Sequence, residues 1–306
     1  MTKVLIATDK PFSPKAVDGI RQIIEASDFE LALLEKYTDV NDFYKAVKDA
    51  DALIVRSDKV TKEVISNTER LKIVVRAGAG FDNLDLAACS ERGIVAMNTP
   101  GQNSNAVAEL ALGFMIYMAR TSFTPATGSE LTGKRLGIHA YGNVGRLVAQ
   151  KARAMGMEIM AFDPFVSEET MIKENVIVAK SVEDLYENSD YISLHIPANN
   201  ETKKSINYAL LSRMPKGACL VNTARKEVIN EEEMLKLLQD RPDFKYITDI
   251  AADNNDSLAA FAPRYFATPK KMGAQTSEAN LNAGIAAANQ IVDYIKNGVT
   301  KFQVNK

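Results

Sequence analysis

The chain has 306 residues, of which 46% are hydrophobic and 25% are charged, and its formal net charge is −2. This composition excludes a disordered or fibrous protein and is typical of a globular chain with room for two hydrophobic cores. The nearly balanced charge offers no basic surface, so we expect no nucleic-acid partner. No apolar stretch approaches the roughly 20 residues of a membrane span, so we expect no membrane partner either.

Cysteine and histidine are too scarce to suggest a metal centre. Cys89 and Cys219 lie far apart and lack the spacing of metal ligands, and the chain has only 2 histidines. We therefore expect no metal. Unpaired cysteines are typical of a reducing compartment, and the opening MTKVLIATDK predicts a first strand and not a signal peptide, so a cytoplasmic location is expected.

Short apolar segments alternate with helical stretches in the first third of the chain. Strands are predicted at 4–7, 53–55, 73–75 and 95–97. This alternation is typical of a parallel sheet with helices on both faces. The next segment, 106–119, is apolar on nearly all sides, which predicts a helix buried between domains or against a second subunit.

The stretch 134–164 is the most informative part of the chain. It predicts a strand, a glycine-containing turn, a helix and a second strand, after which Asp163 follows. Such a turn aims the helix N-terminus at an anion, so Gly142 and the N–H groups of Asn143 and Val144 are expected to bind a pyrophosphate. Asp163 lies about 20 residues beyond the glycines, where a carboxylate binds the ribose hydroxyls of NAD and repels the extra phosphate of NADP. The cofactor is therefore predicted to be NAD.

The glycine fingerprint is incomplete, because G-x-G-x-x-G would require a glycine at Ala140. An alanine fits this turn if its φ is negative. Its methyl group nevertheless crowds a turn that is built for a residue without a side chain. The sequence leaves open whether Ala140 weakens NAD binding.

A second series of strands is predicted at 136–140, 158–162, 177, 191–196, 218–222 and 246–250. This series predicts a six-stranded doubly wound domain. The last helical segment, 278–295, has one apolar face, formed by Leu281, Ile285, Ala288, Ile291 and Tyr294. We expect this helix to return to the first domain, which would make that domain discontinuous.

Six sequence blocks resemble the D-isomer-specific 2-hydroxyacid dehydrogenases, most of all those that act on D-3-phosphoglycerate. The blocks similar to the substrate half of that family are VRSDKVTKEVI (55–65), VVRAGAGFDNLDLAAC (74–89) and NTPGQNSNAVAEL (98–110). Those similar to its cofactor half are SLHIPANNETK (193–203), MPKGACLVNTAR (214–225) and GAQTSEA (273–279). The resemblance covers nearly the whole chain in order. It implies a short form without a C-terminal regulatory domain.

The resemblance implies a fold of the α/β class with two doubly wound parallel-sheet domains and a cleft between them. A flavodoxin-like substrate (catalytic) domain would comprise 1–97 and 283–306, and a Rossmann NAD-binding domain would comprise 98–282. The segment 106–119 would pair two subunits, so a homodimer is expected. The implied reaction is the NAD-dependent oxidation of D-3-phosphoglycerate to 3-phosphohydroxypyruvate, in serine biosynthesis.

Binding residues are carried over from the resemblance by position. Those matching the family's substrate loops are Arg56, Ser57, Arg76 and Gly78. The guanidinium groups of Arg56 and Arg76 would bind the phosphate. Those matching its cofactor contacts are His195, Pro197, Thr202, Thr223, Ala224, Asp249 and Gly273, with Asp249 near the nicotinamide carboxamide. His139, inside a strand, is expected to be a packed core residue.

Arg225 stands where the family has its catalytic arginine. A guanidinium can hold a substrate carboxylate through two parallel hydrogen bonds, which suits that role. Lys226 and Glu227 replace the two glycines that usually follow, so the sequence departs from the family's pattern in the backbone that aims this arginine.

The proton carrier departs from the family, which has a histidine in a T-P-H-x-G setting and a glutamate in an earlier acidic segment. Here the sequence reads ATPKKMGAQT, with Lys271 at the histidine position and Asn254 at the glutamate position. Either catalysis is lost or Lys271 transfers the proton. The paired change favours proton transfer, because a neighbouring carboxylate would raise a lysine pKa that is already too high for a base. Lys270 is the alternative occupant.

Two further functions stay open. The first is reduction of another 2-keto acid, such as glyoxylate or hydroxypyruvate. The second is NAD sensing by a catalytically silent binding protein. The absence of the family's His–Glu pair favours the hypothesis of a catalytically silent protein. The presence of Arg225 argues against that hypothesis.

Overall fold

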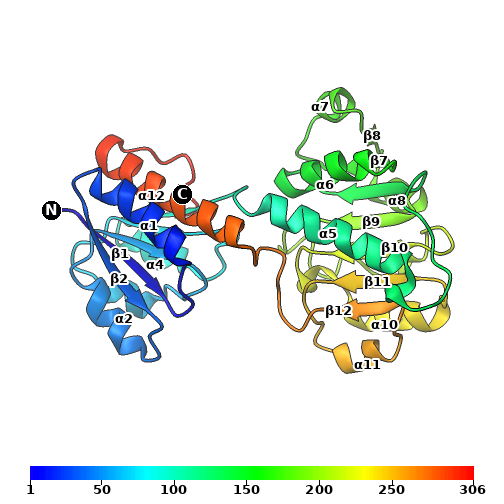
Figure 1. The fold of residues 1–306 in the computed structure, drawn as a ribbon, viewed down its shortest axis with the longest axis horizontal. Helices are drawn as coiled ribbons and strands as arrows, with labels where there is room; N and C mark the ends of the chain where they lie inside the picture. The colour runs from blue at the N-terminus through cyan, green and yellow to red at the C-terminus, as the bar shows by residue number, and fades with distance from the viewer. The chain divides into compact units, whose positions relative to one another are not determined.

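The computed structural model describes residues 1–306, which fold into two compact units (Figure 1). Unit 1 comprises residues 1–103 and 275–306, and unit 2 comprises residues 104–274. Each unit contains one parallel sheet with helices, which confirms the predicted α/β class. None of the helices combines the length and apolar character that crossing a membrane requires.

Unit 1 has a five-stranded sheet in the order β2-β1-β3-β4-β5, which is the flavodoxin-like order. Its strands are β1 (Lys3–Thr8), β2 (Glu30–Glu35), β3 (Ala52–Val55), β4 (Ile73–Arg76) and β5 (Val95–Asn98). Its helices are α1 (Pro14–Glu25), α2 (Val40–Val47), α3 (Lys62–Ser66), α4 (Leu86–Glu91) and α12 (Ser277–Asn297). The sequence pattern misses β2 because this edge strand is only partly covered and carries glutamate at both ends.

The last helix, α12, belongs wholly to unit 1. Its residues Ala283, Ala287 and Ile291 are buried in one apolar cluster with Ile20 and Ile24 of α1. In the structure, α12 thus packs as part of unit 1. The expected boundary at 282/283 falls inside α12, whereas the compact units divide at 274/275, because the whole helix packs as one body.

Unit 2 has a seven-stranded sheet in the order β12-β11-β10-β9-β6-β7-β8. Its strands are β6 (Arg135–His139), β7 (Glu158–Phe162), β8 (Ile177–Val178), β9 (Tyr191–Leu194), β10 (Cys219–Asn222), β11 (Lys245–Thr248) and β12 (Tyr265–Ala267). Its helices are α5 (Ser104–Ala119), α6 (Asn143–Ala154), α7 (Glu168–Lys173), α8 (Val182–Glu187), α9 (Tyr208–Leu211), α10 (Glu231–Asp240) and α11 (Asn255–Ala259), with 3₁₀ turns η1 (Thr121–Phe123) and η2 (Lys226–Val228). The prediction of six strands is wrong, because the sheet has a seventh strand, β12. This edge strand has only three residues, too few to give a recognisable sequence pattern.

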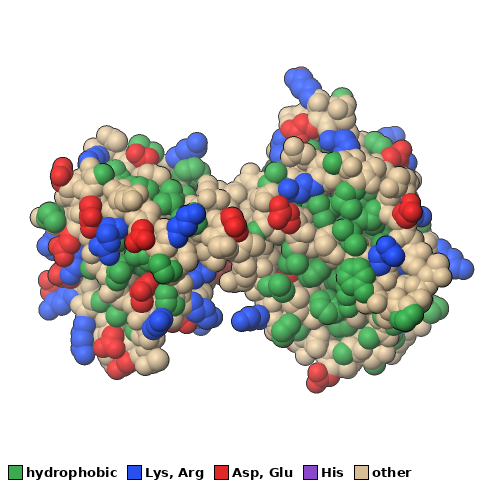
Figure 2. All heavy atoms as spheres, viewed as in Figure 1, with side chains coloured by type: hydrophobic (Ala, Val, Ile, Leu, Met, Phe, Trp, Pro, Cys, Tyr) green, Lys and Arg blue, Asp and Glu red, His purple; other side chains and the backbone are tan.

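Helix α5 packs on the sheet of its own unit. Ala108, Ala111 and Met115 are fully buried in a cluster that includes residues of α6 and the sheet. Other apolar side chains stay accessible, with Ile116 37% exposed and Phe123 in the following turn 68% exposed. Figure 2 shows hydrophobic side chains gathered over the part of unit 2 that carries α5.

Candidate active site

The turn between β6 and α6 leaves a helix N-terminus open. Gly142 is the N-cap of α6 and supplies no side chain to bond the first N–H groups. Gly142 and Asn143 are both exposed, and Val144 is partly buried against the core. Because uncapped N–H groups and the helix dipole favour an anion, the predicted pyrophosphate-binding residues fit that group.

Ala140, at the first position of the turn, has a φ of 78°. Ala140 therefore does not have the negative φ under which an alanine was expected to fit. The turn keeps the left-handed geometry that a glycine normally supplies. An alanine in this region costs roughly 1–2 kcal/mol.

Replacing Ala140 by glycine should therefore stabilise the protein. Relief of the backbone strain exceeds the roughly 0.4–1 kcal/mol by which glycine's extra freedom favours the unfolded chain, so we expect about 0.5–1 kcal/mol of net gain. Urea unfolding would measure it. Ala149→Gly is the matched control, since Ala149 is buried within α6 and should lose stability. An Ala140→Gly protein less stable than wild type would contradict this reading.

Asp163 follows β7 and is fixed beside the turn. Its Oδ2 accepts a hydrogen bond from the N–H of Tyr141 at 2.8 Å, and its Oδ1 accepts one from the N–H of Phe165 at 2.8 Å. Each carboxylate oxygen keeps acceptor capacity for a ribose hydroxyl. The carboxylate predicted to select NAD is thus held in place by backbone groups.

His195 follows β9, next to the turn in the sheet. Its backbone N–H donates to the carbonyl of His139 at 2.9 Å, and its Nε2 lies 3.0 Å from Ser193 Oγ. Burial lowers the pKa of His195 to about 3 and that of His139 to about 4, so both rings are neutral near pH 7. His139 is buried against Tyr186, which confirms it as a packed core residue.

The loop after β9 is closed by Thr202. Its Oγ1 donates to the carbonyl of Pro197 at 2.5 Å and accepts from the N–H of Asn199 at 2.9 Å. Pro197 and Thr202, predicted as cofactor contacts, are therefore joined to one another in a single turn.

The carboxyl ends of β10, β11 and β12 bring a second group of predicted residues together. Lys271 Nζ donates to the carbonyl of Ala224 and lies 3.5 Å from that of Thr223. Arg225 Nη1 donates to the same Ala224 oxygen at 3.0 Å. The ammonium and the guanidinium are therefore neighbours that share one backbone acceptor.

Asp249 is the buried acid of this group, with an exposed fraction of 0%. Its Oδ2 accepts from the N–H of Gly273 at 2.9 Å, and its Oδ1 lies 3.6 Å from Lys271 Nζ. A Cβ at Gly273 would lie 2.9 Å from that Oδ2, so glycine permits the close approach.

Burial lowers the pKa of Lys271 from its ordinary value of 10.5. Asp249 opposes that shift, whereas Arg225 adds to it.

Asp253 is held in an ion pair with Lys226, and Asn254 donates to the carbonyl of Glu231.

Lys270 differs from its neighbour. Its side chain is exposed, whereas that of Lys271 is partly buried in the cluster just described.

The predicted phosphate-binding residues lie at the strand ends of unit 1. The guanidinium of Arg56 donates to the carbonyls of Lys10 at 2.8 Å and Pro11 at 2.9 Å, and to Asn280 Oδ1 at 2.6 Å. Arg76 Nε donates to the carbonyl of Arg56 at 2.9 Å. Arg56 is thus already hydrogen-bonded to neutral oxygens.

The other two predicted substrate residues flank these arginines. Ser57 is exposed, and Gly78 is buried beside the Arg76 guanidinium, which a Cβ at Gly78 would overlap.

Asn222 is a site residue that the sequence did not indicate. It is 1% exposed, its Oδ1 accepts from the N–H of Ala224 at 2.9 Å, and its Nδ2 donates to the carbonyl of Arg225 at 2.9 Å. The amide therefore holds the backbone that carries the shared acceptor. A polar residue ending the apolar strand CLVN was the available signal.

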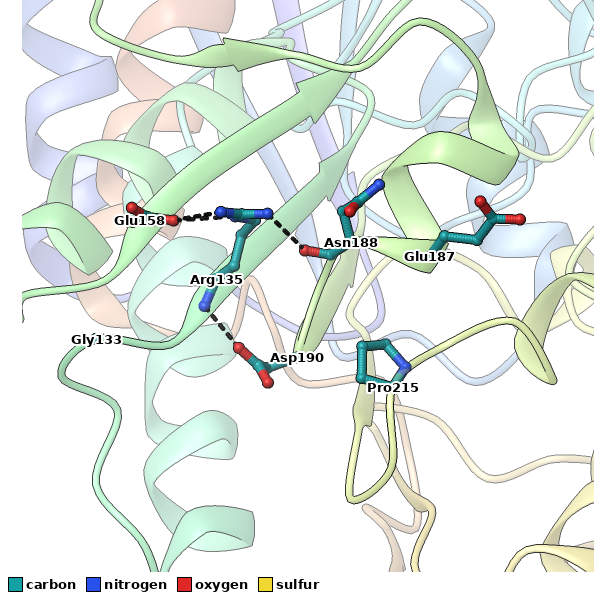
Figure 3. A pocket seen from close by; sticks show the side chains of 7 residues that line it. All are labelled: Gly133, Arg135, Glu158, Glu187, Asn188, Asp190 and Pro215. Atoms are coloured by element: carbon teal, nitrogen blue, oxygen red, sulfur yellow. Dashed lines mark hydrogen bonds and ion pairs between the residues drawn. The ribbon is translucent and has the colours of Figure 1, made fainter.

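A separate hollow lies near the amino-terminal edge of the same sheet (Figure 3). Arg135 there pairs with Glu158 at 2.8 Å, and its backbone N–H donates to Asp190 Oδ2 at 2.9 Å. The lining also contains the acidic side chains Glu187 and Asp190, which repel a phosphate, and no helix begins at any of its residues. The hollow therefore does not fit a dinucleotide.

Comparison with known proteins identifies the family of the chain. The family model of the D-isomer specific 2-hydroxyacid dehydrogenase NAD-binding domain matches residues 110–269, all within unit 2. An NAD⁺-bound 3-phosphoglycerate dehydrogenase structure from Entamoeba histolytica is 47% identical with a TM-score of 0.91, covering 100% of this chain and 99% of that one.

Curated relatives are more distant in sequence. D-3-phosphoglycerate dehydrogenase of Methanocaldococcus jannaschii is 33% identical over 100% of this chain and 60% of its own length. Hydroxypyruvate reductase of Thermotoga maritima is 34% identical over 86% of this chain and 90% of its own length. The chain spans only 55% of the D-3-phosphoglycerate dehydrogenase of Bacillus subtilis. The chain belongs to the D-isomer specific 2-hydroxyacid dehydrogenases, a family of NAD-dependent oxidoreductases.

Proposed function

We propose that the protein oxidises D-3-phosphoglycerate to 3-phosphohydroxypyruvate with NAD, as a step of serine biosynthesis. The observation that carries the proposal is the pairing of Arg225 and Lys271 on the Ala224 carbonyl, at the carboxyl ends of the parallel strands. Ligands of doubly wound sheets bind at that edge. The similarity to an NAD⁺-bound 3-phosphoglycerate dehydrogenase supports the choice of substrate.

Arg225 is proposed to hold the substrate carboxylate and polarise the oxygen on C2. A guanidinium keeps its charge at any working pH and presents several N–H donors in a fixed plane. One of these, on Nη1, is directed to the Ala224 carbonyl. This contact orients the side chain relative to Lys271.

Lys271 is proposed to be the acid/base group. In oxidation its neutral amine takes the proton of the C2 hydroxyl, and in reduction its ammonium returns that proton to the C2 oxygen. The lowered pKa of Lys271 supports this role, because only an uncharged amine accepts a proton. NAD, when bound, would supply the acceptor for the hydride that leaves C2.

The cofactor is proposed to lie along the strand ends of unit 2. Gly142, Asn143 and Val144 would hold its pyrophosphate, and Asp163 its ribose hydroxyls. The group expected along the nicotinamide end comprises His195, Pro197, Thr202, Thr223, Ala224, Asp249 and Gly273. The uncapped start of α6 supports the first part of this proposal.

The phosphate is proposed to bind at Arg56, Ser57, Arg76 and Gly78. The existing bonds of Arg56 to Lys10, Pro11 and Asn280 mean that a phosphate must compete with them. This observation favours a second candidate function, the interconversion of unphosphorylated hydroxypyruvate and D-glycerate. The similarity to a hydroxypyruvate reductase points the same way.

One assay separates the two candidates. NADH formation is followed by absorbance with D-3-phosphoglycerate and with D-glycerate, which differ only in the phosphate. Charge-assisted hydrogen bonds contribute about 1.5–3 kcal/mol each, so D-3-phosphoglycerate should have a kcat/KM at least about tenfold higher. A preference for D-glycerate would identify the second candidate. No turnover of either would contradict both.

The protein is further proposed to be a homodimer paired through the α5 face. The accessible apolar side chains on and beside that helix, Ile116 and Phe123, support this. Light scattering should then give twice the chain mass of 33.5 kDa. A monomer at micromolar concentration would contradict the proposal.

A further inference from the structure

Lys271 Nζ has three oxygen neighbours in the structure. They are the carbonyls of Thr223 at 3.5 Å and Ala224, and Asp249 Oδ1 at 3.6 Å. Two of its N–H donors serve the carbonyls, while its charge faces Asp249 Oδ1 without a hydrogen bond. A neutral amine keeps two N–H donors, enough for the two carbonyls, so removing the proton removes only the ion pair with Asp249.

The two carboxylate oxygens of Asp249 are not equivalent. Oδ2 is bonded to the N–H of Gly273, whereas Oδ1 is buried and accepts no hydrogen bond. A buried carboxylate oxygen without a donor is costly unless a cation faces it, and here the Lys271 ammonium does so. Oδ1 is therefore ready to accept from a better-placed donor.

The nicotinamide carboxamide supplies such a donor, because its NH₂ group has two N–H bonds. We propose that Asp249 Oδ1 changes its partner from Lys271 to the carboxamide when NAD binds, so that cofactor binding releases a proton from Lys271. The inference rests on the proposed function, in which Asp249 lies at the nicotinamide end and Lys271 is the base. It adds that the cofactor itself prepares that base.

The charges around Lys271 fix the sign of the effect. Asp249 and Glu227 raise its pKa, while burial and Arg225 lower it. When Asp249 Oδ1 turns to the carboxamide, its contribution weakens and the pKa falls. Between the pKa values of the free and NAD-bound protein, binding then releases a fraction of a proton to the buffer. By linkage, NAD binding must tighten as the pH rises through this range.

Calorimetry tests this without any turnover. The enthalpy of NAD⁺ binding is measured at about pH 8, below the ordinary lysine value near 10.4, in phosphate and in Tris, which differ in ionisation enthalpy. The difference between buffers gives the number of protons released. ADP-ribose, which lacks the nicotinamide, is the matched ligand. We expect release with NAD⁺ and none with ADP-ribose.

Variants assign the proton. Lys271→Met should abolish the release, and Lys270→Met, at the exposed neighbour, should leave it unchanged. Asp249→Asn keeps an acceptor for the Gly273 N–H and should reduce the release. Equal release by ADP-ribose, release persisting in Lys271→Met, or no release from wild type would each overturn the inference. If Lys271→Met is inactive while wild type releases no proton, the inference fails and the proposed function stands.

Discussion

Lys271→Met is expected to lower kcat for NADH formation by about 100- to 10,000-fold, the usual contribution of a general acid–base group. Methionine keeps the length and apolar stem of the side chain but cannot carry a proton. NAD binding, measured by calorimetry, should persist, because the turn at Gly142 is untouched. Lys270→Met, which removes an exposed lysine from the adjacent position, should retain full activity.

The pH profile gives an independent test of the same group. Oxidation requires the neutral amine, so kcat/KM should rise with pH up to a pKa that burial has lowered from 10.5. Reduction requires the ammonium and should fall over the same range. A rise centred on a histidine-like value near 6.5 would contradict the role of Lys271, as would full turnover by Lys271→Met.

Arg225→Met is expected to lower kcat/KM by roughly 100- to 1,000-fold or more, the range found when one donor to a developing charge is lost. The substrate loses its carboxylate anchor, so KM should rise as kcat falls. Arg225→Lys, which keeps the charge without the planar fork, should recover only part of the loss. Arg213→Met, in an exposed ion pair with Glu187, is the matched control and should be near wild type.

The Arg225 variants also report on Lys271. Arg225 lowers the pKa of that lysine, so removing the guanidinium should move the rise of the oxidation profile to higher pH. A large loss of activity with an unmoved profile would mean that the two side chains do not interact during catalysis.

The strand, turn and helix around Gly142 were predictable because period and composition agree there. β6 is a short apolar run, α6 has an apolar stripe, and both are buried as the pattern requires. Two of the edge strands, β2 and β12, gave no comparable signal. β2 and β12 each pair with a single neighbouring strand, so partial exposure or short length hides their pattern.

Three features of the candidate site depend on contacts that a local pattern cannot encode. The left-handed φ of Ala140 follows from the turn and not from alanine's own preference. Arg56 binds Asn280, which is 224 residues away in the sequence, so a strand-end arginine that looked available for phosphate is partly engaged. The approach of Lys271 to Asp249 likewise joins the ends of two strands.

The placement of α12 has a consequence for protein synthesis. Unit 1 is begun by the first hundred or so residues and finished by the final helix. While the ribosome is still making unit 2, Ile20 and Ile24 lack the helix that covers them in the finished protein. We therefore expect unit 2 to complete its folding first, and the nascent unit 1 to depend on chaperones until α12 emerges.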